Sequence, residues 1–463
     1  MIEKTQNSVE SISIPKQSSR QGLYAAYLIF ILLLAYTFSF IDRQILSLLV
    51  EPMKRDLDIS DTQMSLLQGL SFALFYTLMG LPLGRLADSK SRRGIIAWSI
   101  FIWSLMTAAC GLAKSYWYLF FARMGVGVGE AGLSPAAYSL IADSVEKKHL
   151  AKAIGVYTMG IYLGGGMALI VGGMVIQWAV EFSSITLPII GEVYAWQAVF
   201  LAVGLPGLLL VPFLFTLKEP PRSQKQEKAV PVAEVLAFFK RNKKTVLLHN
   251  FGAALASVAG YGALAWVPSY LIRVHGMESG EVGLAFGLIV LFCGAGGVIV
   301  GGIAADRRFR KGQTDAKMRV AMWAMIIGII PTLIYPLISD LTVVLIILAI
   351  STFFANFMMG LGPAAIQEVV PSNMRGQFSA LYLFIVNLIG LGLGPTLVAL
   401  STDYIFGAPE MVGYSLLLVS LLAMGGSALL LGKCLPHYRA TMRSLEEPSA
   451  LEESSAEQEP SAK

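Results

Sequence analysis

The chain has 463 residues, of which 55% are hydrophobic and only 14% charged, and its formal net charge is +5. Its apolar residues gather in blocks that approach or exceed the roughly 20 residues that a helix needs to cross a bilayer. This composition excludes an ordinary soluble domain and indicates a polytopic helical membrane protein, in which the excess of basic residues is a topology signal rather than a sign of nucleic-acid binding.

The first apolar block, residues 24–50, contains two adjacent charges, Asp42 and Arg43. It follows a polar tail, residues 1–20, and is too long for the apolar core of a cleavable signal peptide. A charge near the middle of a membrane costs about 2.5 to 3.5 kcal/mol, so such residues usually face a cavity or a partner charge. The first span therefore predicts a buried polar site.

The best partner for Arg43 lies in the fourth apolar block, where Arg123 and Glu130 stand seven residues apart. That spacing is almost two helical turns, so both side chains point the same way, about 10 Å apart along the axis. We assign Arg43 to Glu130. Asp42 points about 100° away from Arg43 and is expected to titrate toward the outer cavity. The alternative is a static ion-pair cluster that only joins two spans.

Charges and clusters of glycine or proline divide the apolar sequence into twelve predicted spans. These spans are residues 24–50, 62–86, 94–113, 116–141, 150–178, 195–217, 246–272, 279–304, 318–338, 341–366, 376–401 and 411–434.

The basic residues predict how these spans are oriented. With the N-terminus in the cytoplasm, most lysines and arginines fall in cytoplasmic loops and tails, and only Arg43 and Arg123 lie well inside spans, away from the span ends. This distribution follows the positive-inside rule. We expect a multi-pass protein of the cell (inner) membrane with both termini in the cytoplasm.

The longest internal polar segment divides the spans six and six. We expect an N-terminal six-helix bundle at 21–217 and a C-terminal six-helix bundle at 246–434. The linker between them, 218–245, is basic and contains a sequence amphipathic enough to form a helix on the membrane surface. The acidic tail, 435–463, is predicted to be disordered and cytoplasmic.

The two halves repeat. GRLAD at residues 84–88 ends the second span, and GIAAD at 302–306 ends the eighth; both are followed by paired arginines. SPAA at 134–137 in the fourth span corresponds to GPAA at 362–365 in the tenth. Matching motifs at matching places predict a parallel repeat with a site between the halves.

At these residues the chain resembles the major facilitator superfamily of secondary transporters. GRLADSKSRR (84–93), WQAVF (196–200) and PSNMRG (371–376) resemble motifs of that superfamily. FIDRQ (40–44) and RMGVGVGEAGLSPAA (123–137) resemble its spinster branch, whose animal members export sphingosine-1-phosphate or lysophospholipids. The resemblance implies an all-α fold of twelve transmembrane helices in two six-helix pseudo-repeat bundles.

The resemblance also implies a cytoplasmic gate. In the superfamily the aspartate at the position of Asp88 meets the start of span eleven, here near Gly376, when the cytoplasmic side is closed. The alternative for the paired arginines is that they are only topology charges. The predicted gate residues are Gly84, Asp88, Arg92, Arg93, Asp143, Asp306 and Arg375.

The C-terminal half is poor in charge and rich in aromatic residues, and a charged half facing an apolar half suits an amphiphile. The alternative is that the aromatic residues belong to the ordinary core or face lipid. The predicted cavity residues are Tyr36, Phe40, Tyr261, Trp266, Asn356, Phe357 and Asn387.

These patterns together predict a secondary active transporter that moves a small amphiphilic or lipid-like solute by alternating access. Coupling to protons is expected through Asp42, Arg43, Arg123 and Glu130. Uncoupled facilitation or lipid export by the same fold, and a non-transporting membrane receptor or scaffold, are the alternatives. We expect no enzymatic activity, metal, cofactor or nucleic-acid partner, and a monomer in the lipid bilayer.

Overall fold

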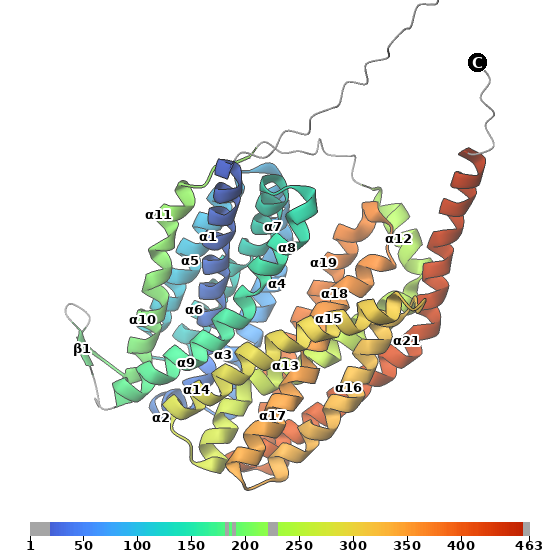
Figure 1. The fold of residues 1–463 in the computed structure, drawn as a ribbon. Coiled ribbons are helices and arrows are strands. Elements are labelled where there is room, and N and C mark those ends of the chain that lie inside the picture. The colour runs from blue at the N-terminus through green and yellow to red at the C-terminus, as the bar shows by residue number, and fades with distance from the viewer. Residues whose placement is uncertain (1–18, 181–184, 188–190, 221–229, 457–463) are drawn as a thin grey trace, which may run out of the picture.

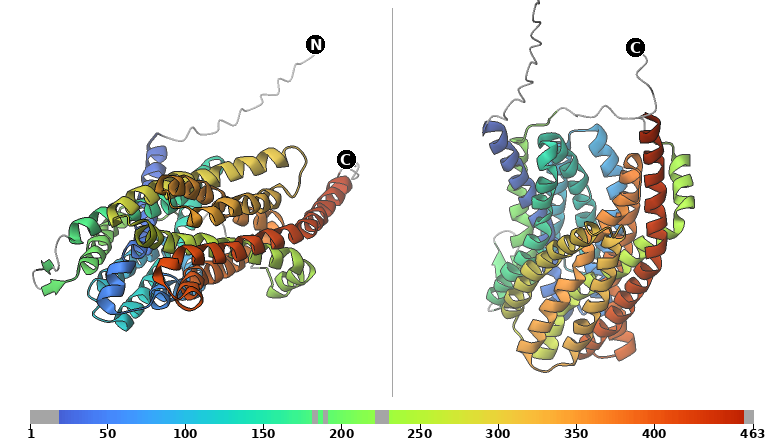
Figure 2. Two further views of the ribbon diagram at one scale, coloured as in Figure 1. Left: turned by 90° about the horizontal axis from the view of Figure 1, so that it is seen from below. Right: turned by 45° about the vertical axis from the view of Figure 1, so that its right-hand side comes forward.

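The computed structural model describes residues 19–180, 185–187, 191–220 and 230–456 (Figures 1 and 2). It is an all-α membrane protein whose helices we describe as a first half, α1 to α11, and a second half, α13 to α21, with bounds given below. The described chain begins and ends at the same end of the molecule, which we call the terminal end, and the other is the opposite end (Figure 1). Most of the predicted N-terminal tail and residues 457–463 of the acidic tail lie outside the described residues. The prediction of a disordered tail is wrong for residues 435–456, because the last helix of the chain continues to Ala456.

The first half consists of long helices, several shorter ones and one small hairpin. In chain order its elements are α1 (Ser19–Gln44), the 3-10 turn η1 (Ile45–Leu48), α2 (Val50–Leu57), α3 (Asp61–Gln68), α4 (Leu70–Ser89), α5 (Arg92–Cys110), α6 (Tyr116–Glu130), α7 (Leu133–Ser144), α8 (Lys147–Thr158), α9 (Gly160–Val180), β1 (Ile185–Leu187), β2 (Gly191–Val193), α10 (Ala195–Leu208) and α11 (Leu210–Phe215). The strands form a small antiparallel hairpin.

The linker helix and the second half follow. They are α12 (Val232–Arg241), α13 (Lys243–His275), α14 (Ser279–Leu288), the π-turn η2 (Ile289–Gly294), α15 (Ala295–Phe309), α16 (Ala316–Ile334), η3 (Tyr335–Leu337), α17 (Leu341–Ala355), α18 (Phe357–Glu368), η4 (Ser372–Met374), α19 (Arg375–Ile385), the π-turn η5 (Val386–Leu391), α20 (Gly392–Leu400), the π-turn η6 (Ser401–Phe406), η7 (Pro409–Met411) and α21 (Val412–Ala456).

Within the described residues, 11 helices are long and apolar enough to cross a membrane. The remaining predicted span, 116–141, falls on α6 and α7, which are separated by Ala131 and Gly132. Each of these helices, with 15 and 12 residues, is shorter than a spanning helix. Together they cover the length of the fourth span.

The halves share this break in the fourth span of each. In the first half α6 ends at Glu130, and in the second half α17 ends at Ala355 with Asn356 as its C-cap. The helices that follow, α7 and α18, each have 12 residues and carry the repeated SPAA and GPAA sequences. The predicted sequence repeat thus corresponds to a structural one.

Small residues let the two halves approach closely along α9 and α14. A Cβ atom added to Gly173 would lie 2.7 Å from the carbonyl oxygen of Ser279, and one added to Gly166 would lie 2.9 Å from Cβ of Leu291. Glycine is therefore required for this distance between the helices, as is common where membrane helices pack. Figure 1 shows α9 and α14 side by side, and the halves spreading apart toward the terminal end.

Candidate functional site

The predicted ion pair between Arg43 and Glu130 is present. Nε of Arg43 lies 2.6 Å from Oε2 of Glu130, and the hydroxyl of Ser39 donates to the same oxygen at 2.6 Å. Glu130 is the last residue of α6 and is buried, whereas the side chain of Arg43 keeps 14% of its surface exposed. The sequence reasoning missed Ser39, although it lies one helical turn before Arg43 on α1.

Asp42 and Arg123 lie beside this pair, and both are buried. Oδ2 of Asp42 accepts a hydrogen bond from Thr107 at 3.2 Å, and Nη1 of Arg123 donates to the backbone oxygen of Asp42 at 3.2 Å. The expected orientation of Asp42 toward the outer cavity is wrong, because its side chain packs against α5 inside the first half and does not line the cavity between the halves.

Three polar atoms of this cluster have no protein hydrogen-bond partner among the described residues: Oδ1 of Asp42, Oε1 of Glu130 and Nε of Arg123. A buried charged group whose hydrogen bonds are incomplete is costly in a medium of low dielectric constant. The two acids can therefore accept a proton, and Nε of Arg123 can donate to a further acceptor, at small structural cost.

Aromatic rings surround the guanidinium group of Arg43. Its Cζ lies 4.7 Å from the ring centre of Phe40, 4.6 Å from that of Phe72 and 4.6 Å from that of Tyr76. Rings at this distance attract a cation through their electron-rich faces. The aromatic residues thus hold the positive charge in place while Glu130 supplies only one oxygen to it.

A cavity of about 120 Å³ lies between the halves and is lined largely by apolar side chains. Phe40 and Tyr162 line it from the first half, and Tyr261 and Asn356 from the second. The hydroxyl of Tyr162 donates across the cavity to Oδ1 of Asn356 at 3.1 Å. Phe40 contributes to both sites, since its ring borders the cavity and also contacts Arg43.

Phe40, Tyr261 and Asn356 of the predicted cavity residues line this cavity, and the other four do not. Tyr36 stacks on Tyr157 with ring centres 4.6 Å apart, and Trp266 is fully buried with its indole N–H bonded to the carbonyl of Pro395. Phe357 packs under Gly301, and Asn387 lies in η5 and is not one of the lining residues. The rotation of each helix, which a list of aromatic residues does not reveal, explains these differences.

Arg92 is the centre of a polar cluster at the terminal end of the first half. Its guanidinium group is paired with Asp143 and with Glu219, the latter at 2.9 Å. Glu219 also accepts hydrogen bonds from the hydroxyl of Ser91 and from the backbone N–H groups of Arg92 and Arg93, at the start of α5. Partial burial alone would raise the pKa of the Glu219 carboxyl, but these hydrogen bonds outweigh it and hold that pKa below its usual value.

The other predicted gate residues are separate from this cluster. Asp306 and Arg375 are exposed in the second half, and the Cβ position of Gly376 has no atom within 4 Å. A Cβ added to Gly84 would first meet Pro135, at 4.0 Å. The side chain of Asp88 lies outside the described residues. The expected contact between Asp88 and the start of span eleven therefore stays a prediction.

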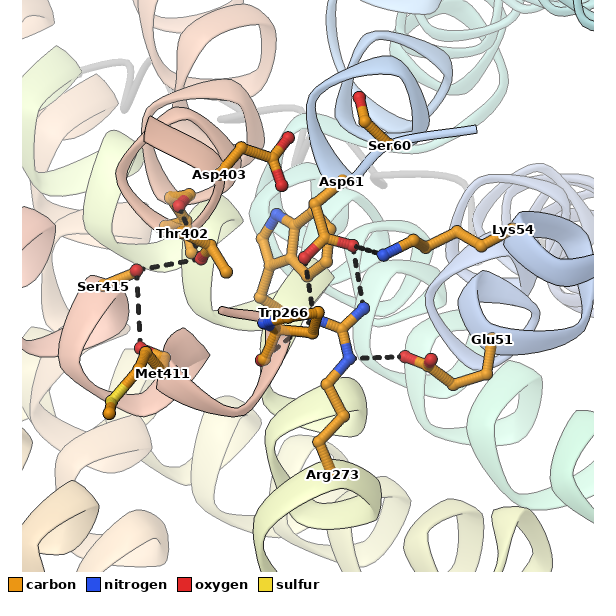
Figure 3. Close-up of polar contacts among 12 residues, drawn as sticks. Glu51, Lys54, Ser60, Asp61, Trp266, Arg273, Thr402, Asp403, Met411 and Ser415 are labelled. Carbon is orange, nitrogen blue, oxygen red and sulfur yellow. Dashed lines mark hydrogen bonds and ion pairs between the residues drawn. The ribbon is translucent and has the colours of Figure 1, made fainter. Parts of the chain in front are cut away.

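A second ionic cluster joins the halves at the opposite end, and we call its residues Glu51, Lys54, Asp61 and Arg273 the opposite-end bridge (Figure 3). Arg273 of α13 binds both oxygens of Asp61, at 2.7 and 2.8 Å, and Glu51 at 2.8 Å. Lys54 is paired with the same Asp61, whose side chain is fully buried.

A second contact lies beside this bridge. Asp403 of η6 accepts hydrogen bonds from the backbone N–H and the hydroxyl of Thr62, at 2.7 and 2.6 Å. The sequence did not identify the residues of the opposite-end bridge or of this contact as a site, because they lie at the ends of spans, where charged residues are common. The sequence offered one signal for this site: an acidic residue at the start of a helix, where the helix dipole favours negative charge.

The chain is similar to known transporters along most of its length. A family model described as Major Facilitator Superfamily matches residues 32–395. An MFS-type efflux pump of Mycolicibacterium smegmatis is 27% identical over 405 residues, covering 86% of this chain and 90% of that protein. A hexuronate transporter of Bacillus subtilis is 26% identical, covering 81% and 87%, and spinster homolog 1 of Xenopus tropicalis is 26% identical, covering 82% and 74%.

Two solved structures are similar over nearly the whole chain. A bacterial homologue of the human lysosomal transporter spinster, in an inward-facing and unoccupied conformation, is 27% identical with a TM-score of 0.74 and covers 92% of this chain and 98% of its own. The occupied, inward-facing form is 28% identical with a TM-score of 0.72, covering 91% and 97%.

Proposed function

The chain belongs to the major facilitator superfamily of transporters, and from this premise we propose that it moves a small amphiphilic or lipid-like organic solute across the membrane, driven by protons. The observation that carries the proposal is the position of Phe40. One ring separates a charged group, Arg43, from an apolar cavity between the halves. An amphiphile can place its anionic head beside Arg43 and its chain in the cavity, and the similarity to spinster proteins supports this substrate class.

Proton coupling follows from how Glu130 holds Arg43. Both hydrogen bonds from Ser39 and Arg43 end on Oε2, which leaves Oε1 for a proton. Protonation removes the negative charge, so Arg43 becomes available to an anionic head group through its exposed edge. Asp42 supplies a second carboxylate, and its free Oδ1 allows a proton to reside there instead. The proton and the substrate head group then interact with the same set of charged side chains.

Alternating access requires that one end be closed while the other opens. In the structure the opposite-end bridge and the Thr62–Asp403 contact join the halves, whereas the halves spread apart toward the terminal end (Figure 1). We propose that the terminal end is cytoplasmic, as the basic loops predict, and that residues 21–217 and 246–434 rock about the cavity with 218–245 as the linker. The similarity to inward-facing structures supports this orientation.

The proposal is tested by uptake of a labelled lysophospholipid or sphingosine-1-phosphate into proteoliposomes with an imposed pH gradient. The wild type should accumulate substrate against its gradient. The Glu130→Gln and Asp42→Asn variants keep the shape of each side chain but cannot lose a proton, so each should only equilibrate substrate. Glu192→Gln, at an exposed acid of β2, is the matched control and should behave as wild type.

Each failure has its own meaning. Equal, pH-independent flux in all variants would refute coupling and favour uncoupled facilitation or lipid export by a static cluster. Binding without flux would favour a receptor. Transport of a hexuronate such as glucuronate, but not of lipids, would favour the substrate class named for the Bacillus subtilis relative. It would contradict the proposal of an amphiphilic substrate.

A further inference from the structure

The linker between the halves ends in the short helix α12, which is fixed to the surface of the second half. Phe238 and Phe239 are partly buried against the core of that half. The ring of Phe238 meets the ring of Phe378 in α19 edge to face, with centres 5.4 Å apart. Asn242, which follows α12, accepts a hydrogen bond at 3.2 Å from Thr441 of α21. These contacts place α12 beside α21 at the terminal end (Figure 1).

Four cations stand where α12 ends and α13 begins: Lys240, Arg241, Lys243 and Lys244. All four are exposed, and the part of the chain that the structure describes offers none of them an acidic partner. This differs from Arg92 and Arg273, whose charges are neutralised by carboxylates at the two ends of the molecule. The end of α12 and the start of α13 therefore carry four positive charges that the described chain does not balance.

The position of these cations relative to the spanning part of α13 suggests their partner. Lys243 precedes Val246, a buried apolar residue of this helix, by three residues, or about 5 Å of helix. Leu247 and Phe251 are 37% and 42% exposed and follow Lys243 at intervals of four residues, on the same face. Lysines directly above an exposed apolar stripe of a membrane helix extend their ammonium groups to the level of the lipid headgroups.

We propose that α12 and the first turn of α13 form a docking surface for anionic phospholipid headgroups of the leaflet at the terminal end. The four cations contact the headgroups, and Leu236, which is 48% exposed on α12, contacts the outer part of the acyl chains. Each basic residue at an anionic membrane surface contributes about 1 kcal/mol, or about fivefold in affinity. The surface is independent of the transported solute.

An acidic peptide segment is the competing partner, because the tail after Arg443 is rich in glutamate. Anionic lipid is the favoured partner because the cations lie at the level where α13 enters the bilayer. Lipid headgroups are present there at high local concentration. Since Phe238 rests on Phe378, lipid bound to α12 also braces α19, which belongs to span eleven.

The test is hydrogen exchange, followed by mass spectrometry, of the full chain in lipid nanodiscs. Amides of residues 231–246 should exchange at least about fivefold more slowly in discs containing phosphatidylglycerol than in pure phosphatidylcholine, the effect of one basic residue. High salt should abolish the difference, since it screens surface charge. The variant that combines Lys240→Gln, Arg241→Gln, Lys243→Gln and Lys244→Gln should show no difference between the lipids.

The matched control replaces Arg307, Arg308, Arg310 and Lys311 with Gln, which removes the same charge from the exposed end of α15 and the turn after it. It should keep the phosphatidylglycerol effect. Equal exchange in both lipids for the wild type, or an undiminished effect in the α12 variant, would overturn the proposal. So would faster exchange in phosphatidylcholine after truncation behind Arg443, because the tail would then be the partner.

Discussion

At the residue scale, the chain treats buried charges in two ways. Arg92 and Arg273 are saturated by carboxylates, and each joins elements that are distant in sequence. Glu130 and Asp42 instead keep one free oxygen each. Saturated charges stabilise a contact, whereas an incompletely bonded one can change its protonation state at lower cost. This contrast is why we place proton coupling at the second group.

Glu219 allows the stabilising role of a carboxylate that neutralises a buried arginine to be tested. The depressed pKa of its carboxyl means that it stabilises the folded state above the unfolded pKa of about 4.3, and that this stability is lost as the pH falls through the lower, folded value. Glu219→Gln should therefore destabilise the protein by about 1 to 2 kcal/mol at pH 7. The difference in the free energy of unfolding between the variant and the wild type should disappear below about pH 4.

Thermal unfolding in detergent across this pH range measures the effect. Glu192→Gln, at an exposed acid without these contacts, provides the reference. A difference in stability that stays the same at all pH values would show that the Glu219 side chain acts through its shape rather than its charge.

At the scale of elements, glycine sets how closely the helices around the site can pack. A Cβ atom at Gly129 of α6 would lie 2.6 Å from the backbone nitrogen of Trp103 in α5. Because backbone atoms cannot move aside as a flexible side chain can, α6 would have to shift, together with the adjacent Glu130. The geometry of the ion pair therefore depends on a residue that takes no part in it.

We accordingly expect Gly129→Ala to destabilise the fold by about 1 to 3 kcal/mol through overpacking. Gly155→Ala in α8 is the matched control, since the new Cβ meets no atom within 4 Å and alanine favours a helix by up to about 1 kcal/mol. The measurement is the unfolding midpoint of both variants in the same detergent. Equal midpoints would show that α5 and α6 have room to separate.

At the scale of the whole molecule, the two halves are related by repeat but are joined unequally. Each half pairs the start of its third span with the end of its fourth, through Arg92–Asp143 in the first and Lys317–Glu368 in the second. The opposite-end bridge, by contrast, connects the halves to each other. We expect the pairs within a half to persist during transport and the bridge to break.

Arg273→Gln should therefore favour opening at the opposite end. Removing one partner of a buried ion pair costs about 3 to 5 kcal/mol, and Lys54 still compensates part of the charge of Asp61, so we expect a shift of at least about tenfold in the population of states. Spin labels at Arg55 and Glu410, after replacement of Cys293, measure the distance between the halves.

Lys114→Gln, an exposed charge at the same end, is the control and should leave the distance distribution as in wild type. A distribution for Arg273→Gln that matches the control would show that the bridge does not determine the closed state.

The sequence by itself determined the family, the membrane fold and the partner of Arg43. A charge in a long apolar helix must be compensated nearby, and few candidates exist, so the Arg43–Glu130 pair could be predicted. Only the tertiary structure decided that Asp42 packs against Thr107, that Trp266 does not line the cavity, and that Arg273 joins the halves at the opposite end. These features depend on the rotation of each helix and on contacts between residues about 200 positions apart, which local pattern and composition do not specify.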